Sequence, residues 1–437
     1  MRNAVGGLHA LMLVNKRWHD LACDDGVWRA LVLEAREHDG KLSFRGSWKA
    51  TLRAVLVKKN QAEARRRQLL EQRLARKEGR PVPPSSVIDG EDVMAMATFD
   101  FSTSPPLLRL GCWGAESGQI ERVDGRALSA SSFASQFDAA RLPTILVGVV
   151  SEWRAFSRWQ LEEISKHYGA EVVACAQYSK RGRIRIALGD FVAYMKTQRD
   201  VSPLYVFDED VIARVAQMRE DYAIPEFLWQ DLFVLLGKHL RPSYRWLLLG
   251  PERSGSGFHF DPHGTTAWNA LLVGRKRWAL YPPGRVPPGV KVEADDDGFV
   301  YSFEAPDPLS WLRDVLPRLA QHERPIEFTQ QAGELVFVPS GWWHQVLNLE
   351  PTVSVTQNLC NEHNLDAVTE SLLRDGHGDM LQRLTQRLQL VEPRLYHLTR
   401  QHTQRAIDRL GGQEALAYRS EARVLLRATK YSNYVVR

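Results

Sequence analysis

The stretch that decides the fold is GFHFDPHGTTAWNALLVGRKRWALYPP, residues 257–283. It contains three short apolar and aromatic runs, GFHFD, AWNALLVG and KRWALYPP, separated or ended by Gly and Pro. Runs of this length between turn residues are typical of strands. Similar runs occur on both sides, among them YRWLLLG before the stretch and ELVFVPS, HQVLNL and VSVTQN after it. Many short strands at close spacing predict a β-barrel or sandwich.

Two polar residues in the first run are either metal ligands or ordinary polar residues beside a turn. His259 and Asp261 are two positions apart, and on a strand such side chains point to the same face. Non-haem Fe(II) oxygenases bind iron through two histidines and one carboxylate on one face of the metal and leave the other positions open. The third ligand must then come from another strand, and GWWHQVLNL supplies His344.

Other polar residues of the same types need a different interpretation. His377-Gly378-Asp379 repeats the histidine-any-aspartate spacing between two helical segments, so we interpret it as a turn. His263 as a fourth ligand would close a coordination position that the chemistry needs. We therefore expect His263 outside the metal shell, at the mouth of the site. Trp342 and Trp343 are expected to pack the end of the barrel.

The segments GPERSGSGFHFDPHGTTAWNALLVGRKRW (250–278) and GELVFVPSGWWHQVLNLEPTVSVTQN (333–358) resemble the JmjC domain of the 2-oxoglutarate oxygenases. Within this family the resemblance is strongest to the arginine demethylase/lysyl hydroxylase subgroup, once called the phosphatidylserine receptor. It is equally strong to plant proteins that join an F-box to a JmjC domain, and covers roughly residues 140–360. It implies a mainly β fold, a double-stranded β-helix (jelly-roll, cupin-like) core with flanking α-helices.

The resemblance also implies the roles of individual residues. His259, Asp261 and His344 match the iron ligands. Lys276 matches the residue that holds the distal carboxylate of 2-oxoglutarate, and we expect it to be partly buried, where a cation needs a partner charge. Further hydrogen bonds to 2-oxoglutarate are implied for Tyr205, Ser256, Asn269 and Thr356.

The run VSVTQN alternates polar and apolar residues. Ser354, Thr356 and Asn358 are predicted to face the site, while Val353 and Val355 are predicted to face outwards.

The implied activity is that of an enzyme that uses Fe(II), 2-oxoglutarate and O2, with ascorbate as a reductant in vitro. Its substrates would be Arg or Lys side chains of proteins, such as histone tails or other Arg/Lys-rich segments. N-demethylation and lysyl hydroxylation remain open as the reaction. We expect a nuclear or nucleo-cytoplasmic protein.

The N-terminus carries a second resemblance. VNKRWHDLACDDGVWRALVLE (14–34) is similar to the second half of an F-box, although the opening helix of that family is absent. The resemblance implies a Skp-type adaptor as partner. The alternative function is then a substrate receptor of a cullin–RING ubiquitin ligase, with the JmjC domain as its substrate-binding module. A small helical appendage that packs on the catalytic domain is the other interpretation.

We expect four regions: an F-box-like helical segment (1–50), a basic Pro-containing linker (51–95), the JmjC catalytic domain with its α/β extension (96–360) and a helical C-terminal region (361–437). Residues 53–80 carry ten Lys or Arg against three Glu. This run is interpreted as a solvated helix or as a weak nucleic-acid contact. Met380, Leu381, Leu384 and Leu388 form a helical stripe, for internal packing or for a homodimer.

Composition supports an ordered chain, since 44% of the 437 residues are hydrophobic and 25% are charged. The four cysteines are scattered, which suits a reducing compartment. The sequence contains no apolar run near the roughly 20 residues of a membrane span, and we read no signal peptide. These features predict a soluble, intracellular protein.

Overall fold

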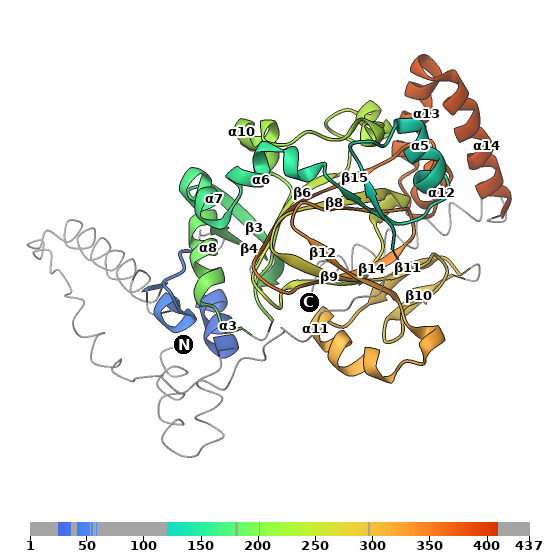
Figure 1. Cartoon of the computed structure of the whole chain (residues 1–437). Coiled ribbons are helices and arrows are strands. Elements are labelled where there is room, and N and C mark those ends of the chain that lie inside the picture. The colour runs from blue at the N-terminus through green and yellow to red at the C-terminus, as the bar shows by residue number, and fades with distance from the viewer. Residues whose placement is uncertain are drawn as a thin grey trace, which may run out of the picture. The chain divides into compact units, whose positions relative to one another are not determined.

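The computed structural model describes residues 25–35, 42–52, 54–55, 58, 120–179, 182–200, 202–295 and 298–409 (Figure 1). The chain forms two compact units. Unit 1 comprises Met1–Arg109 and Tyr178–Ser202, and unit 2 comprises Leu110–Gln177 and Pro203–Arg437. Among the helices that the structure describes, none has both the length and the apolar content needed to cross a membrane.

Unit 2 is built on two sheets. In the larger sheet the strands lie in the order β1 (Arg122–Asp124), β2 (Thr144–Val147), β13 (Leu335–Val338), β8 (Thr266–Val273), β15 (Thr352–Leu359), β6 (Arg245–Gly250), β5 (Val206–Asp208) and β3 (Val172–Ser179). The smaller sheet has the order β12 (Ile326–Gln331), β9 (Arg275–Tyr281), β14 (Trp343–Asn348) and β7 (Gly255–His259). Strands β1 and β2 are parallel, and the neighbouring pairs from β2 to β3 and throughout the smaller sheet are antiparallel.

The two sheets enclose an apolar interior. From the larger sheet Ile145 and Val336 contribute to it, and from the smaller sheet Trp278, Phe328 and Val346 do. Strand alternation turns these side chains inward. The expected mainly β, jelly-roll core with flanking helices is therefore confirmed.

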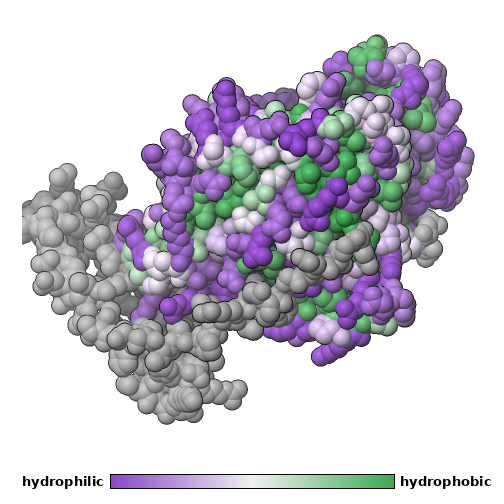
Figure 2. Space-filling model, in the orientation of Figure 1, coloured by the Kyte–Doolittle hydropathy of each residue, from purple (hydrophilic) through white to green (hydrophobic). Residues whose placement is uncertain are grey.

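Helices cover one end of the core (Figure 1): α12 (Leu365–Arg374), α13 (Gly378–Val391) and α14 (Pro393–Arg409). The predicted stripe is buried in this chain's own cluster, which includes residues of η6 (Leu232–Leu236). In the space-filling view the outer side of α13 and α14 is mostly hydrophilic (Figure 2), although Leu390 and Val391 are exposed. The stripe Met380, Leu381, Leu384 and Leu388 thus packs internally.

The outer face of β15 is covered by other parts of the chain. Ser354 faces Lys276, so Val353 and Val355 lie on the opposite, outward face as expected, and both are completely buried there. On that side of the larger sheet, η4 (Val150–Glu152) and α6 (Arg154–Arg158) contact β8, and Trp153 packs against Trp268. The sheet is therefore covered on both faces, and apolar residues are required on each.

Unit 1 contains α3 (Asp25–Ala35), residues 42–52, β4 (Gly182–Ala187) and α8 (Leu188–Thr197). Its core holds Trp48, which is fully buried and packs edge-on against Tyr194. Both side chains donate to Asp200 Oδ2, Trp48 Nε1 at 2.9 Å and Tyr194 OH at 2.7 Å. The second helix of the F-box-like segment is observed as α3. The first helix and most of the predicted linker lie outside the described residues.

Candidate metal and co-substrate site

Neighbouring strands carry the two predicted histidine ligands. His259 ends β7 directly opposite His344 on β14, and their ring centroids lie 4.2 Å apart. Asp261 follows β7 in an extended conformation (φ −67°, ψ 143°), so the two-residue alternation continues although the strand has ended. One ligand atom from each of the three side chains lies within 4.8 Å of the others. Within the described ranges, no other group of three or more His, Cys, Asp or Glu side chains has this geometry.

Each of the two histidines, His259 and His344, is oriented by a hydrogen bond from its Nδ1 to a backbone carbonyl. His259 Nδ1 donates to Gly257 O (2.8 Å), and His344 Nδ1 donates to Trp342 O (3.0 Å). Because a carbonyl oxygen can only accept, each ring carries its proton on Nδ1 and presents the lone pair of Nε2. Burial is the largest cause that lowers the pKa of each imidazole to about 4. Both rings are therefore neutral at physiological pH, as metal binding requires.

A bulge in β7 orients His259. Between the pairs His344–His259 and Val346–Ser256 the register of β7 against β14 shifts by one residue. Gly257 lies in this bulge, where a β carbon would come within 2.7 Å of Pro306 O. Only glycine allows this close approach, and the same residue supplies the carbonyl that holds His259.

Asn358 on β15 holds the carboxylate. Its Nδ2 donates to Asp261 Oδ1 and to Thr265 Oγ1, both at 2.9 Å. Burial raises the pKa of Asp261, whereas the electrostatic interaction with His259 and the Asn358 hydrogen bond lower it. One carboxylate oxygen is thus occupied by the amide, and Oδ2 remains for a metal ion.

The variant Asn358→Leu is expected to weaken metal binding about 10–100-fold, because outer partners of metal ligands typically contribute that much. The measurement is a Co(II) titration of the metal-free chain. Asn361→Leu is the matched control, since Asn361 Nδ2 donates to the carboxylate of Asp138 (2.6 Å) outside the ligand set. Equal metal affinity in the two variants would contradict the role given to Asn358.

Lys276 is completely buried on β9, more deeply than the sequence suggested. Its Nζ donates to Ser354 Oγ at 2.7 Å. Burial alone lowers its pKa to about 7, and no carboxylate of the described chain contributes to the shift. A buried cation without an anion is unfavourable, so the site fits a ligand that brings a carboxylate.

Asn269 and Thr356 are paired across β8 and β15. Thr356 Oγ1 donates to Trp268 O at 2.7 Å. Asn269 is buried, and its Oδ1 has no hydrogen-bond partner within the described chain. An unpaired buried amide oxygen costs about 1–3 kcal/mol. This atom therefore fits a pocket that receives a polar ligand or its water.

Sequence reasoning missed Asn348. It lies on β14 opposite Lys276 and is completely buried. Its Nδ2 donates to Ser254 Oγ at 2.8 Å, while its Oδ1 has no partner within the described chain. The signal was available, because Asn348 is four residues after His344 and strand alternation places both on one face.

Tyr205 lies beside Asn348, and Ser256 is placed by the pairing of β7 with β14. A β carbon on Gly250 would lie 2.6 Å from Tyr205 Cδ2 and 2.7 Å from Asn348 Nδ2, so the ring of Tyr205 is next to Asn348. Burial raises the pKa of Tyr205, which therefore remains a neutral phenol. Ser256 lies on β7 opposite Val346, whose side chain belongs to the interior.

The turn after Asp261 is strained and close to a helix. His263 has a left-handed backbone (φ 57°), and its ring lies 5.1 Å from the ring of His377 at the start of α13. His263 is outside the ligand group, as expected. Its expected place at the mouth of the site stays a prediction. His377-Gly378-Asp379 begins α13 and forms no metal group within the described residues.

Gly264→Ala is expected to destabilise the protein by about 2–4 kcal/mol. Gly264 has φ 65°, and a β carbon would lie 2.6 Å from the carbonyl carbon and oxygen of Ala367 in α12. Urea unfolding measures the change. Gly284→Ala is the control, because Gly284 has φ 79° with nothing within 4 Å of the added carbon, so only about 1 kcal/mol is expected. Equal losses would contradict the clash.

The two tryptophans before His344 pack opposite sides of β14. Trp342 belongs to the interior cluster, and its Nε1 donates to Arg141 O at 3.0 Å. Trp343 belongs to the outer cluster with Phe258 and Trp311. The predicted packing role of both residues is confirmed.

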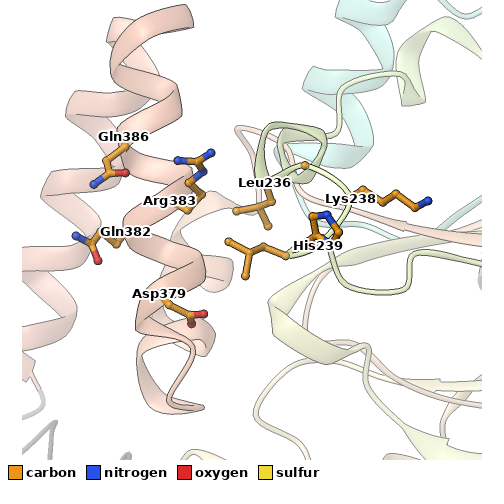
Figure 3. A pocket seen from close by; sticks show the side chains of 9 residues that line it. Leu236, Lys238, His239, Asp379, Gln382, Arg383 and Gln386 are labelled. Carbon is orange, nitrogen blue, oxygen red and sulfur yellow. The ribbon is translucent and has the colours of Figure 1, made fainter.

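A separate groove of about 510 Å³ lies between the segment 236–240 and α13 (Figure 3). His239 from the loop and Asp379 and Arg383 from α13 line it. The residues predicted to bind iron or 2-oxoglutarate do not line this groove, so it is distinct from the candidate site.

The comparisons with known proteins agree with this geometry. The model of a family described as cupin-like domain matches residues 130–359. The Arabidopsis thaliana "Lysine-specific demethylase JMJ21" is 46% identical over 58% of this chain and 26% of its own length. The Caenorhabditis elegans "Bifunctional arginine demethylase and lysyl-hydroxylase psr-1" is 36% identical over 64% of this chain and 70% of its own length. The human "2-oxoglutarate and iron-dependent oxygenase JMJD4" is 30% identical over 55% of this chain and 61% of its own length.

The chain spans only about a quarter of the length of the Arabidopsis relative. The family match nevertheless covers more than half of the chain and includes His259, Asp261 and His344, the smaller sheet and the strands of the larger sheet from β2 onwards. This chain belongs to the family of cupin-like domains of the JmjC type.

Proposed function

We propose that this chain is an Fe(II)- and 2-oxoglutarate-dependent oxygenase that acts on Arg or Lys side chains of proteins. The observation that carries the proposal is the group His259, Asp261 and His344, whose ligand atoms lie within 4.8 Å of one another. Two neutral imidazoles and one carboxylate are the donor set of a non-haem iron site with open positions.

The co-substrate would bind beside the metal. Lys276 would pair with the distal carboxylate of 2-oxoglutarate, and Ser354 orients its ammonium group. Further polar contacts would come from Tyr205, Ser256, Asn269 and Thr356, and Asn348 would provide another. The apolar interior around Trp278 and Val346 would exclude bulk water and so limit side reactions.

Bound iron supplies the oxidation of a C–H bond by O2, coupled to the decarboxylation of 2-oxoglutarate to succinate and CO2. One oxygen atom of O2 enters succinate and the other becomes the hydroxyl group of the product. If the carbon is a side-chain methylene, the hydroxyl stays. If it is an N-methyl group, the product loses formaldehyde, which gives demethylation.

The proposed substrate class rests on the relatives. The nematode relative is named for arginine demethylation and lysyl hydroxylation, and the Arabidopsis relative for lysine demethylation. We propose basic protein segments such as histone tails as substrates, and a nuclear or nucleo-cytoplasmic location. The ubiquitin-ligase receptor alternative gains no support from the described part of residues 1–50.

The test incubates the full chain with iron, ascorbate, 2-oxoglutarate and paired methylated and unmethylated Arg/Lys peptides. Mass spectrometry is expected to show the gain of one oxygen atom or the loss of a methyl group, with one succinate formed for each event. Failure to modify any peptide, together with no succinate above that of a His344→Ala control, would refute the proposal.

A further inference from the structure

The imidazole ring of His344 stacks against the indole ring of Trp278. Trp278 on β9 is almost completely buried, and its ring faces that of His344 with centroids 5.9 Å apart and an interplanar angle of 27°. Its ring also stacks with Phe328, at 5.9 Å and 9°. The orientation of this indole therefore limits the orientation of His344.

A glutamine holds the indole. Gln330 on β12 is completely buried and lies directly opposite Lys276. Its Oε1 accepts from Trp278 Nε1 at 2.9 Å. Its Nε2 donates to Asn269 O at 2.9 Å and to Glu334 O at 3.0 Å. One side chain thus connects the indole behind His344 to the backbone of the strand that carries Asn269.

We propose that Gln330 and Trp278 form a positioning pair that sets the orientation of His344 relative to the co-substrate side of the site. The inference rests on the proposed function, because it assumes that His344 binds a metal ion. The amide oxygen and both amide protons of Gln330 are bonded, and a fully satisfied buried network is rigid. A metal ligand must be held within roughly 0.5 Å of its working position, which such a network achieves.

The alternative is that Gln330 and Trp278 stabilise the fold without affecting His344. A measurement of metal binding distinguishes the two roles. The variants are Trp278→Phe, which removes the indole N–H, Gln330→Met, which keeps the approximate volume, and the double variant. Co(II) is titrated into each metal-free full chain, and its visible absorption bands report the ligand geometry. We expect each single variant to weaken Co(II) binding about tenfold and to shift the bands.

The double variant tests whether Gln330 acts through Trp278. If it does, the loss of affinity in the double variant will be close to that of Trp278→Phe alone, because the coupled contact is already gone. Additive losses would overturn the pairing of the two residues.

Trp159→Phe is the matched control. Trp159 is also completely buried, and its Nε1 donates to Asp221 Oδ2 at 2.9 Å away from the ligand group. We expect thermal stability to fall in both tryptophan variants, but the Co(II) bands to shift only in Trp278→Phe. Unchanged bands and affinity in Trp278→Phe would overturn the inference.

A failure of the proposed function gives a different result from a failure of the positioning pair. In that case the wild-type chain would bind no Co(II), or His344→Ala would bind it as well as wild type. If His344→Ala abolishes binding while Trp278→Phe and Gln330→Met leave it unchanged, only the positioning pair is refuted.

Discussion

His259→Ala and Asp261→Ala are each expected to weaken metal binding by more than about a hundredfold, beyond the usual effect of outer partners, and to abolish 2-oxoglutarate-dependent succinate formation. Each change removes one of three donor atoms that lie within 4.8 Å of one another. With only two protein donors left, water occupies the third position, and the metal ion is no longer held by three ligands on one face. The measurements are Co(II) titration of the metal-free chain and succinate release.

The same stretch provides the control. His263 is two residues from Asp261 but lies against His377, outside the ligand group. His263→Ala is therefore expected to bind Co(II) nearly as tightly as wild type. A loss in His263→Ala as large as in His259→Ala would show that the ligand set is assigned wrongly.

The relation between His259 and Asp261 could be predicted from the sequence because it depends only on residues close together in the chain. Strand alternation placed His259 and Asp261 on one face, and the extended backbone of Asp261 keeps that relation beyond the end of β7. The hairpin of β10 (Lys291–Ala294) and β11 (Val300–Glu304) was not foreseen. β10 is only four residues long and mostly polar (KVEA), and β11 (VYSFE) alternates apolar and polar residues without a continuous apolar run.

Contacts between residues that are far apart in the sequence could not be predicted from local patterns. Gln330 meets the indole of Trp278 only because β12 and β9 pair in a particular register. No residue near Gln330 in the sequence indicates that partner. The complete burial of Lys276 likewise depends on the closure of the two sheets, whereas the sequence predicted only partial burial.

Lys276→Met is expected to raise the stability of the unloaded protein at pH 6–7 and, at the same time, to weaken 2-oxoglutarate binding more than about a hundredfold. The pKa of Lys276 is lowered from 10.5 to about 7 by burial. Between these values the unfolded chain binds the proton and the folded chain does not, so the wild type gains stability as pH rises from 7 to 10.5. Below pH 7 the burial of the charge costs on the order of 5 kcal/mol, which methionine avoids.

Thermal unfolding of wild type and Lys276→Met from pH 6 to 10 measures this difference. We expect the advantage of the variant to be largest at pH 6 and to shrink towards pH 10. Adding 2-oxoglutarate should raise the unfolding temperature of the wild type only, since its carboxylate supplies the missing partner for the ammonium group.

Arg277, next to Lys276, provides a control for which the expected change in stability has the opposite sign. Arg277 points to the other face of β9 and pairs with Glu327 at 2.7 Å. Arg277→Met leaves that buried carboxylate without its partner and should destabilise the protein by about 3–5 kcal/mol. If Lys276→Met destabilises the unloaded protein as Arg277→Met does, then Lys276 already has an anionic partner in the folded chain. Its buried charge would in that case no longer be an argument for a carboxylate ligand.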